Sequence, residues 1–245
     1  ALRDAGYQVV VICPHMRGFT LLEDQLDGIQ IDRRWISGEA GGFTGFVREY
    51  CAALWGEFRL ALKAWRRHRF QIIHLCNPPD LLFLVAWPFR LLFGVRIIYD
   101  VHDVWPEMFE AKFERRGPLY WAVRLAERLT YACAHVVLAT NESVRQIAIA
   151  RGRKPAEKVF VVRTAPKIAT ADRPPDPALK KNRRYLVGYV GVMGNADGVH
   201  YLLEAADHLI NRLGRRDVQF LLMGTGPEHP KLLEQRDRLG LAEWV

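Results

Sequence analysis

Two carboxylates and an imidazole stand together where an apolar run of strand length ends. Asp100, His102 and Asp103 follow the run from Val95, in a segment that continues to Pro106. Ligands of open parallel α/β sheets bind at the carboxyl ends of the strands, so polar groups crowded there indicate a site. Such groups act as general acids or bases, as metal ligands or as loop caps, and all three readings stay open. No further ligand cluster for a metal is evident in the sequence.

Other polar residues occupy comparable positions. Asn77 and Asp80 follow another strand-like run and should emerge on the same rim, where they either bond hydroxyl groups of a ligand or cap the next helix. Glu107 comes directly after Pro106, and a proline suits the first turn of a helix. Asp103 and Glu107 therefore either belong to the site or simply favour the N-terminus of that helix.

Two glycine-rich turns later in the chain have the composition of phosphate-binding turns. Each follows a strand-like run and opens a helical pattern, and their candidate residues are Gly191, Gly194, Asn195, Gly198, Gly224 and Gly226. Glycine lets the backbone approach a ligand closely, and free N–H groups at a helix N-terminus favour phosphate. Each turn alone also reads as an ordinary strand-to-helix turn. Together, at one edge of one sheet, they favour a nucleotide diphosphate ligand.

The elements that must position these residues alternate along the chain. Continuous apolar runs of strand length are typical of a parallel sheet covered on both faces. We expect strands at residues 7–13, 71–75, 95–100, 135–139, 158–162, 185–190 and 218–223, and helices at 46–67, 79–93, 118–133, 142–150 and 199–213.

A proline-rich segment with clustered charges and no helical or strand period interrupts this alternation. The predicted fold class is therefore α/β, with two Rossmann-like doubly wound parallel-sheet domains facing across a cleft. The expected boundaries are an acceptor-side domain at 1–163, a linker at 164–184 and a partial nucleotide-binding domain at 185–245. The first strand and the C-terminal part of this plan are expected to be missing from the chain.

The composition and net charge of the chain favour some classes of binding partner over others. The chain has 245 residues, half of them apolar, and a net charge of +8 that is spread through its arginines. This charge favours phosphates or an anionic membrane surface, whereas no nucleic-acid-binding motif is present. Three stretches, 55–70, 81–96 and 109–116, combine apolar or aromatic residues with basic ones. Such helices either lie in a lipid interface or present a solvated cationic face over a packed apolar one.

Other features of the sequence argue against further classes of protein. No stretch reaches the roughly twenty apolar residues of a membrane span, and no signal peptide is recognisable. Neither a G-x-S-x-G elbow nor a P-loop appears, which argues against serine hydrolases and P-loop kinases. The four cysteines, Cys13, Cys51, Cys76 and Cys133, form no C-x-x-C pair, and we expect reduced, mostly buried thiols of a cytosolic protein.

With these residues assembled, the chain resembles the family 4 retaining glycosyltransferases, which have the two-domain GT-B fold. The resemblance covers nearly the whole chain. It is carried by residues 74–80, 99–107, 126–129 with 139–143, and 187–194 with 197–199. It implies a nucleotide-diphosphate sugar donor held mainly by the second domain and a glycan or lipid-linked acceptor bound mainly by the first. The residues expected to contact the acceptor are Asn77, Asp80, Asp103 and Glu107. His102 would lie near the transferred sugar, and the turn from Gly191 to Gly198 would face the diphosphate.

The resemblance also implies a reaction with retained anomeric configuration, without a cofactor and usually without a bound metal. We expect a cytoplasmic enzyme of cell-surface polysaccharide biosynthesis that lies at the inner face of the cell membrane. Many relatives place an arginine and a lysine around the donor turn, where this chain has Met193 and Asp197. The alternatives are a nucleotide-sugar epimerase of the same fold and a non-catalytic nucleotide-binding module.

The resemblance places two functional elements outside the chain. The acidic E-x7-E element would follow Val245, and the glycine-rich acceptor loop would precede Ala1. We therefore expect residues 1–245 alone to be inactive.

Overall fold

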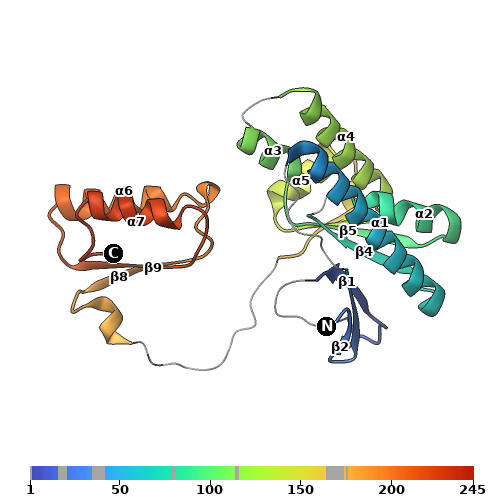
Figure 1. The fold of residues 1–245 in the computed structure, drawn as a ribbon, viewed down its shortest axis with the longest axis horizontal. Helices are drawn as coiled ribbons and strands as arrows, with labels where there is room; N and C mark the ends of the chain where they lie inside the picture. Colours follow the sequence, from blue (N-terminus) through green and yellow to red (C-terminus); the bar gives the residue numbers. More distant parts are fainter. Residues whose placement is uncertain are drawn as a thin grey trace. The chain divides into compact units, whose positions relative to one another are not determined.

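The computed structural model describes residues 2–15, 21–34, 42–78, 81–113, 116–163, 174 and 176–245. The chain forms two compact units, residues 1–166 and 167–245, and each is described by itself (Figure 1). The division falls within the proline-rich segment that the sequence assigns to a linker. That segment was expected to lack structure, but it contains a short 3-10 helix at Pro177–Lys180, where Asp176 accepts a hydrogen bond from the backbone N–H of Ala178.

The first unit is built around a four-stranded parallel sheet, as expected. Its strand order is β4-β5-β6-β7. The strands are β4 (Ile72–Cys76), β5 (Arg96–Val101), β6 (Val136–Ala139) and β7 (Val159–Val161), each within two residues of the predicted run at both ends. Parallel pairing requires long crossovers between strands, and the helices of this unit provide them.

A separate three-stranded sheet holds the first strand. β1 (Val10–Pro14) pairs in parallel with β3 (Ile29–Arg34), and β3 pairs antiparallel with β2 (Glu23–Leu26). The sequence analysis missed β2 and β3 because their charged and polar residues give no continuous apolar run. The first predicted strand therefore belongs to a sheet of its own rather than to the main parallel sheet.

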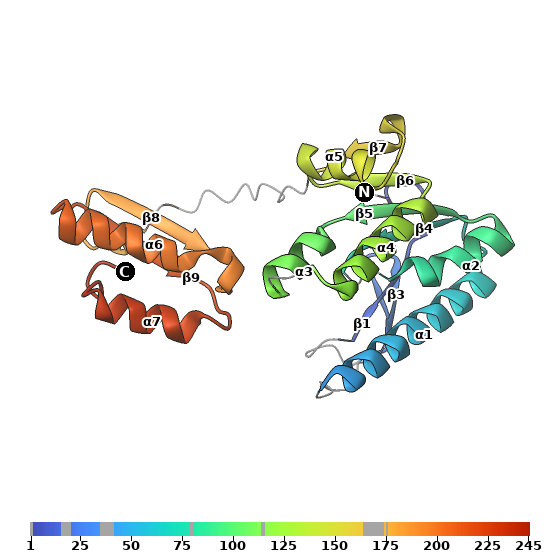
Figure 2. The ribbon, with the colours of Figure 1, turned by 90° about the horizontal axis from the view of Figure 1, so that it is seen from above.

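Five α-helices accompany these sheets in the described part of the unit. They are α1 (Gly42–His68), α2 (Phe83–Phe93), α3 (Trp105–Phe113), α4 (Pro118–Cys133) and α5 (Glu142–Ala150). Pro118 starts α4, Gly94 ends α2 in a left-handed conformation, and Asn141 caps α5 by accepting the N–H of Val144. Helix α1 packs against α2, and α2 against α4 (Figure 2).

The core of the first unit lies on one face of β5. Ile97, Tyr99 and Val101 alternate with less buried residues, and Ile97 is fully buried. The ring of Tyr99 meets that of Tyr131 edge-on at 5.5 Å between centroids. The expectation of strands buried on both faces is wrong for β4 and β5, because the side chains opposite to this core remain partly exposed. This open face is where the polar residues gather.

The second unit contains two parallel strands, β8 (Tyr185–Val190) and β9 (Val218–Met223), as predicted. Helices α6 (Val199–Asp207) and α7 (His229–Arg238) pack together on one face of this small sheet (Figure 1). The predicted long helix after the first glycine turn ends as an α-helix at Asp207 and continues as a π-helical turn at His208–Arg212. The carbonyl of Trp244 accepts the N–H of Phe220 at 2.8 Å, which ties the last described residues to β9.

The cysteines differ from expectation in burial. All four are free, but only Cys133 is buried, whereas Cys51 and Cys76 are exposed and Cys13 is intermediate. Exposure of Cys76 follows from its position on the open face of β4. Among the described residues, no helix is both long enough and apolar enough to span a membrane.

Candidate functional site

The open face of β4 and β5 gathers four side chains with functional chemistry. Successive residues of a strand point to opposite faces, so His74 and Cys76 share a face. The strands pair in register with Cys76 beside Asp100, which places Asp100 on that same face. His102 follows two residues later, immediately after β5. The carboxyl ends of two adjacent strands therefore present two imidazoles, a thiol and a carboxylate.

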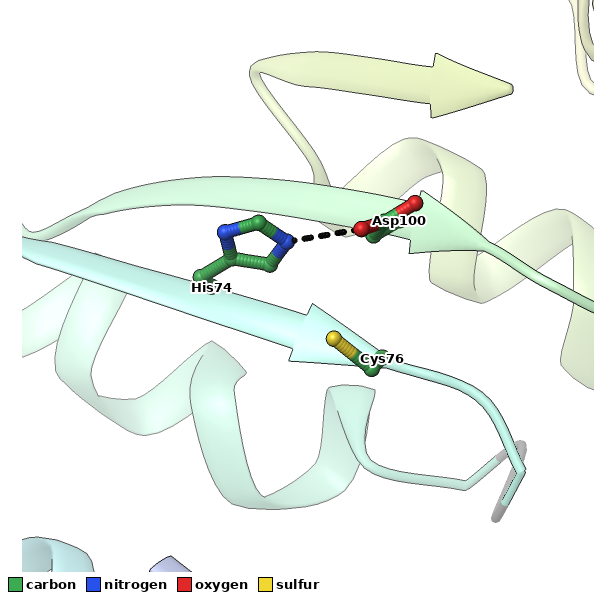
Figure 3. Close-up of side chains that lie close together, drawn as sticks. All are labelled: His74, Cys76 and Asp100. Carbon is green, nitrogen blue, oxygen red and sulfur yellow. Dashed lines mark hydrogen bonds and ion pairs between the residues drawn. The ribbon is translucent and has the colours of Figure 1, made fainter. Parts of the chain in front are cut away.

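The Asp100 carboxylate is the centre of this group. Its Oδ2 atom lies 3.1 Å from Nε2 of His74 and 3.4 Å from Nε2 of His102. Figure 3 shows the His74 ring extending from β4 towards Asp100 on β5. A neutral histidine whose Nε2 faces a carboxylate carries its proton on that nitrogen, which leaves Nδ1 as an acceptor. Burial, together with the charge of Asp100, raises the pKa of the Cys76 thiol.

Asn77 fixes the backbone that carries His102. It is buried, and its Oδ1 accepts the N–H groups of His102 and Asp103 at 2.8 and 3.3 Å. Its Nδ2 donates to the carbonyl of Asp103 at 2.7 Å. The side chain of Asn77 thus positions the turn after β5 and does not extend into solvent.

Not all of the other candidate site residues of the first unit lie in this group. Asp103 lies in the turn that Asn77 holds, and Asp80 lies outside the described residues. Glu107 stands on α3, where Arg151 donates to both of its carboxylate oxygens, at 2.5 and 2.9 Å. These contacts give Glu107 a structural partner, and its contact with an acceptor stays a prediction.

Arg151 also binds a second carboxylate. Its Nη2 lies 2.6 Å from Oε1 of Glu127, whose side chain is only 6% exposed. Burial raises the pKa of Glu127, although the guanidinium opposes this effect. Glu107 is also partly desolvated, but its hydrogen bond and ion pair with Arg151 hold its pKa below the usual value. This triad links α3, α4 and the end of α5.

In the second unit, the two glycine turns lie against each other. The N–H of Gly191 donates to the carbonyl of Met223, and the N–H of Met193 donates to that of Thr225. A Cβ atom at Gly224 would lie 1.9 Å from the carbonyl oxygen of Gly191. One at Gly226 would lie 2.5 Å from that of Met193. Both glycines are therefore required by the approach of the two turns, whether or not a ligand binds.

An acidic residue occupies part of the first turn. Asp197 accepts the N–H of Gly194 through Oδ2 at 2.8 Å, so this amide already has an anionic partner. Asn195 is exposed in the same turn, and Gly198 adopts a left-handed conformation, with φ +67°, at the start of α6. Beside the turn is a hollow of about 450 Å³, lined by Gly194, Asn195, Val199, His200, Glu228, Lys231, Leu232, Glu234, Gln235 and Arg238.

A basic groove of about 720 Å³ lies along α1 and β3 in the first unit. Its lining consists of Arg33, Arg34, Gly56, Arg59, Leu60, Leu62, Lys63, Arg66 and Arg67. Phe58 and Trp65 of the same helix pack against the core, and Trp65 stacks on Phe93. The stretch 55–70 is thus a cationic face over a packed apolar one, and Trp55 remains exposed.

Sequence reasoning missed His74 and Cys76 as site residues, and it left the role of Asp100 open between acid–base catalysis, metal binding and loop capping. The signal was present in the alternation of residues along β4. This alternation identifies a site only when the strand register, which places Cys76 beside Asp100, is also known.

Comparison with known proteins identifies two family regions. Residues 1–165 match the glycosyl transferase 4-like domain, and residues 184–245 match glycosyl transferases group 1. No match was found among curated proteins.

Solved structures show the same fold at low sequence identity. A sucrose-phosphate synthase from Thermosynechococcus elongatus matches all of this chain with a TM-score of 0.73 and 12% identity, and the chain covers 61% of that protein. A trehalose-6-phosphate protein from E. coli, bound with UDP-2-fluoro glucose, matches 96% of the chain with a TM-score of 0.65 and 13% identity, over 63% of its own length. The apo lipopolysaccharide outer core galactosyltransferase WaaB matches 98% of the chain with a TM-score of 0.56 and 15% identity, over 67% of its own length.

These neighbours establish a GT-B-like α/β fold for the chain, which spans about three fifths of the length of the sucrose-phosphate synthase. The 4-like domain alone matches residues 1–165, well over half of the sequence. The chain therefore belongs to the glycosyltransferases that have a glycosyl transferase 4-like domain.

Proposed function

We propose that this chain works in an enzyme that transfers a sugar from a nucleotide-diphosphate sugar to a glycan or lipid-linked acceptor, with retention of configuration. The observation that carries the proposal is the placement of His102. Two strands of the 4-like domain hold it, through Asn77 at its backbone and Asp100 at its ring. A polar group fixed on rigid elements suits the orientation of a reacting sugar.

The second unit supports binding of the donor. Its glycine turns open α6 and α7, and the N-terminus of a helix stabilises the negative charge of a diphosphate leaving group. In this proposal that stabilisation replaces a metal ion, so transfer needs neither a metal nor a cofactor. Asp197 adds a negative charge to the turn and weakens the attraction for phosphate. The UDP-2-fluoro glucose in the E. coli neighbour supports a nucleotide-sugar donor.

The basic groove supports a location at an anionic membrane surface. Arg59 and Arg67 lie on one helix, and each basic group near such a surface contributes about 1 kcal/mol of attraction, whereas Lys63 between them is already paired with Glu23. The neighbouring α2 exposes Leu91 and Leu92. We propose that the enzyme works in the cytoplasm, against the inner face of the cell membrane, in the synthesis of cell-surface polysaccharide.

The test is to incubate the natural full-length protein with nucleotide sugars and lipid-linked or glycan acceptors. Release of nucleoside diphosphate measures transfer, and NMR of the product reports the anomeric configuration. We expect His102→Ala to lower kcat by about 100-fold, the scale of losing one polar contact in the transition state. His208→Ala, at an exposed histidine of the second unit, should leave kcat unchanged.

Other results would overturn the proposal in distinct ways. An inverted product excludes retention. An isomerised sugar nucleotide formed without any acceptor identifies an epimerase. Nucleotide binding without transfer or hydrolysis identifies a non-catalytic module.

A further inference from the structure

The side chains of His74, Cys76 and Asp100 together form a set of metal-binding donors. One ligand atom from each, an imidazole nitrogen, the thiol sulfur and a carboxylate oxygen, lie within 4.8 Å of one another. Figure 3 shows the three side chains on the adjacent strands β4 and β5. Of the three residues, only Asp100 takes part in the proposed sugar transfer, where it contacts the ring of His102; His74 and Cys76 have no assigned role there.

The spacing is close to what a zinc ion requires. Zinc binds nitrogen and oxygen at about 2.0–2.2 Å and sulfur at about 2.3 Å, so its ligand atoms lie roughly 3.3–3.7 Å apart in a tetrahedron. The Nε2 atom of His74 and the Oδ2 atom of Asp100 are already 3.1 Å apart. Small rotations of exposed side chains are enough to bring Cys76 Sγ into the same arrangement, because its ligand atom is within 4.8 Å of both.

The backbone beneath the three residues is regular. His74 and Cys76 stand two residues apart on one strand, and Cys76 is in register with Asp100 on the next. Donors on paired strands keep their relative positions better than donors on loops, which lowers the cost of organising a site. The exposed face gives an ion direct access from solvent.

The donor set also determines which ion is preferred. A thiolate is a soft ligand that selects zinc and related transition metals over Mg²⁺ and Ca²⁺, and an imidazole favours the same ions. Nε2 of His102 faces the same Asp100 oxygen, Oδ2, that lies nearest Nε2 of His74, so an ion bound there would lie next to the His102 ring. Three protein ligands leave a fourth position for water.

We propose that His74 Nε2, Cys76 Sγ and a carboxylate oxygen of Asp100 bind a thiophilic divalent cation, with zinc as the best fit. The inference goes beyond the proposed sugar transfer, which needs no metal, and does not depend on it. The ion would bind beside His102 and share Asp100 with it.

The experiment uses Co²⁺ as a spectroscopic probe of the purified, chelator-treated full-length protein. We expect one equivalent of Co²⁺ to produce the visible bands of a tetrahedral ion and a near-ultraviolet charge-transfer band from the thiolate. One equivalent of Zn²⁺ should abolish both. Absence of these bands, or bands that survive excess Zn²⁺, would overturn the proposal.

Variants identify the ligands. Cys76→Ser should remove the charge-transfer band and weaken Zn²⁺ binding by at least about 100-fold, whereas Cys51→Ser, at an exposed cysteine of α1, should change neither. His74→Ala and Asp100→Asn should also weaken binding, and His102→Ala should retain the band because His102 is not a ligand. Loss of the band in Cys51→Ser, or its persistence in Cys76→Ser, contradicts the assignment.

Folding is checked separately in the same set. The far-ultraviolet circular dichroism and the metal-free Tm of Cys76→Ser should match those of the parent protein. Zn²⁺ should raise the Tm of the parent and leave that of Cys76→Ser unchanged, because an ion that binds only the folded state stabilises it. Equal Zn²⁺ stabilisation of both proteins would place the ion elsewhere and overturn the proposal.

Discussion

The buried amide of Asn77 accepts the backbone N–H of His102 at 2.8 Å, across two adjacent parallel strands. This contact sets the direction in which the chain leaves β5. It also explains why an asparagine directly after β4 matters to a histidine 25 residues later. The Asp100 carboxylate lies beside the ring of His102, with 3.4 Å between Oδ2 and Nε2. Backbone and ring are therefore held by different residues, and each can be tested alone.

We predict that Asn77→Ala destabilises the first unit by about 2 kcal/mol and also reduces sugar transfer. The substitution removes the buried amide of Asn77, so the N–H of His102 and the carbonyl of Asp103 lose this partner. Urea unfolding and a transfer assay measure the two effects. Thr130→Ala is the matched control, since it removes a buried hydrogen bond to the carbonyl of Ala126, worth about 1 kcal/mol, near the amino end of β6 and so away from the strand ends that carry His102. Transfer that falls equally in both variants would argue against positioning by Asn77.

We predict that Gly224→Ala destabilises the second unit by more than about 2 kcal/mol. The added Cβ atom would lie 1.9 Å from the carbonyl oxygen of Gly191, and a backbone atom cannot move away as a flexible side chain does. Gly188→Ala is the control, because a Cβ atom there meets nothing within 4 Å. Thermal unfolding followed by circular dichroism compares the two. Equal Tm values would show that the turns do not pack as described.

We predict that Arg151→Ala destabilises the protein by about 3 kcal/mol near neutral pH. It leaves the buried carboxylate of Glu127 without its guanidinium partner. Arg116→Ala, which breaks the exposed pair with Glu110, should cost less than about 1 kcal/mol. Chemical denaturation of both variants measures the difference.

The cost of Arg151→Ala should also depend on pH. The pKa of Glu127 is raised in the folded protein, so the folded state binds its proton more tightly than the unfolded state does. The contribution of Glu127 to stability therefore increases as pH falls through that raised pKa. Without Arg151, the charged form of the Glu127 carboxylate destabilises the folded state more strongly, and protonation of Glu127 removes this destabilisation. The difference in the free energy of unfolding between the variant and the parent protein should therefore shrink as pH falls from about 8 to about 5. A difference that stays constant or grows contradicts this account.

We predict that the basic groove binds anionic liposomes. Arg59→Glu combined with Arg67→Glu should weaken binding by at least about 30-fold at low ionic strength, equivalent to about 1 kcal/mol for each basic group lost. Arg212→Glu, in the second unit, should change binding little. Sedimentation with liposomes of increasing anionic content measures the affinity, and added salt should reduce it. If the parent protein does not bind the liposomes, or if added salt does not weaken its binding, the proposed location at a membrane surface is wrong.

The sequence by itself determined the parallel strands β4 to β9 and the glycine turns. Apolar runs, glycines and prolines act locally, so their positions can be read along the chain. It did not reveal β2 and β3, whose short polar strands depend on pairing with neighbours. Likewise, it could not show that Gly224 and Gly226 are needed for contact between two turns rather than for contact with a ligand.

Only the tertiary structure decided which polar side chains meet. His74 and Asp100 are 26 residues apart, and their contact depends on strand register, which no local pattern specifies. The same applies to Glu107, which resembled a site residue in sequence and is engaged by Arg151 from the end of α5. Local periodicity thus gave the strand end at which His102 lies, whereas pairing between strands selected Asp100 and Asn77 as the residues that hold it.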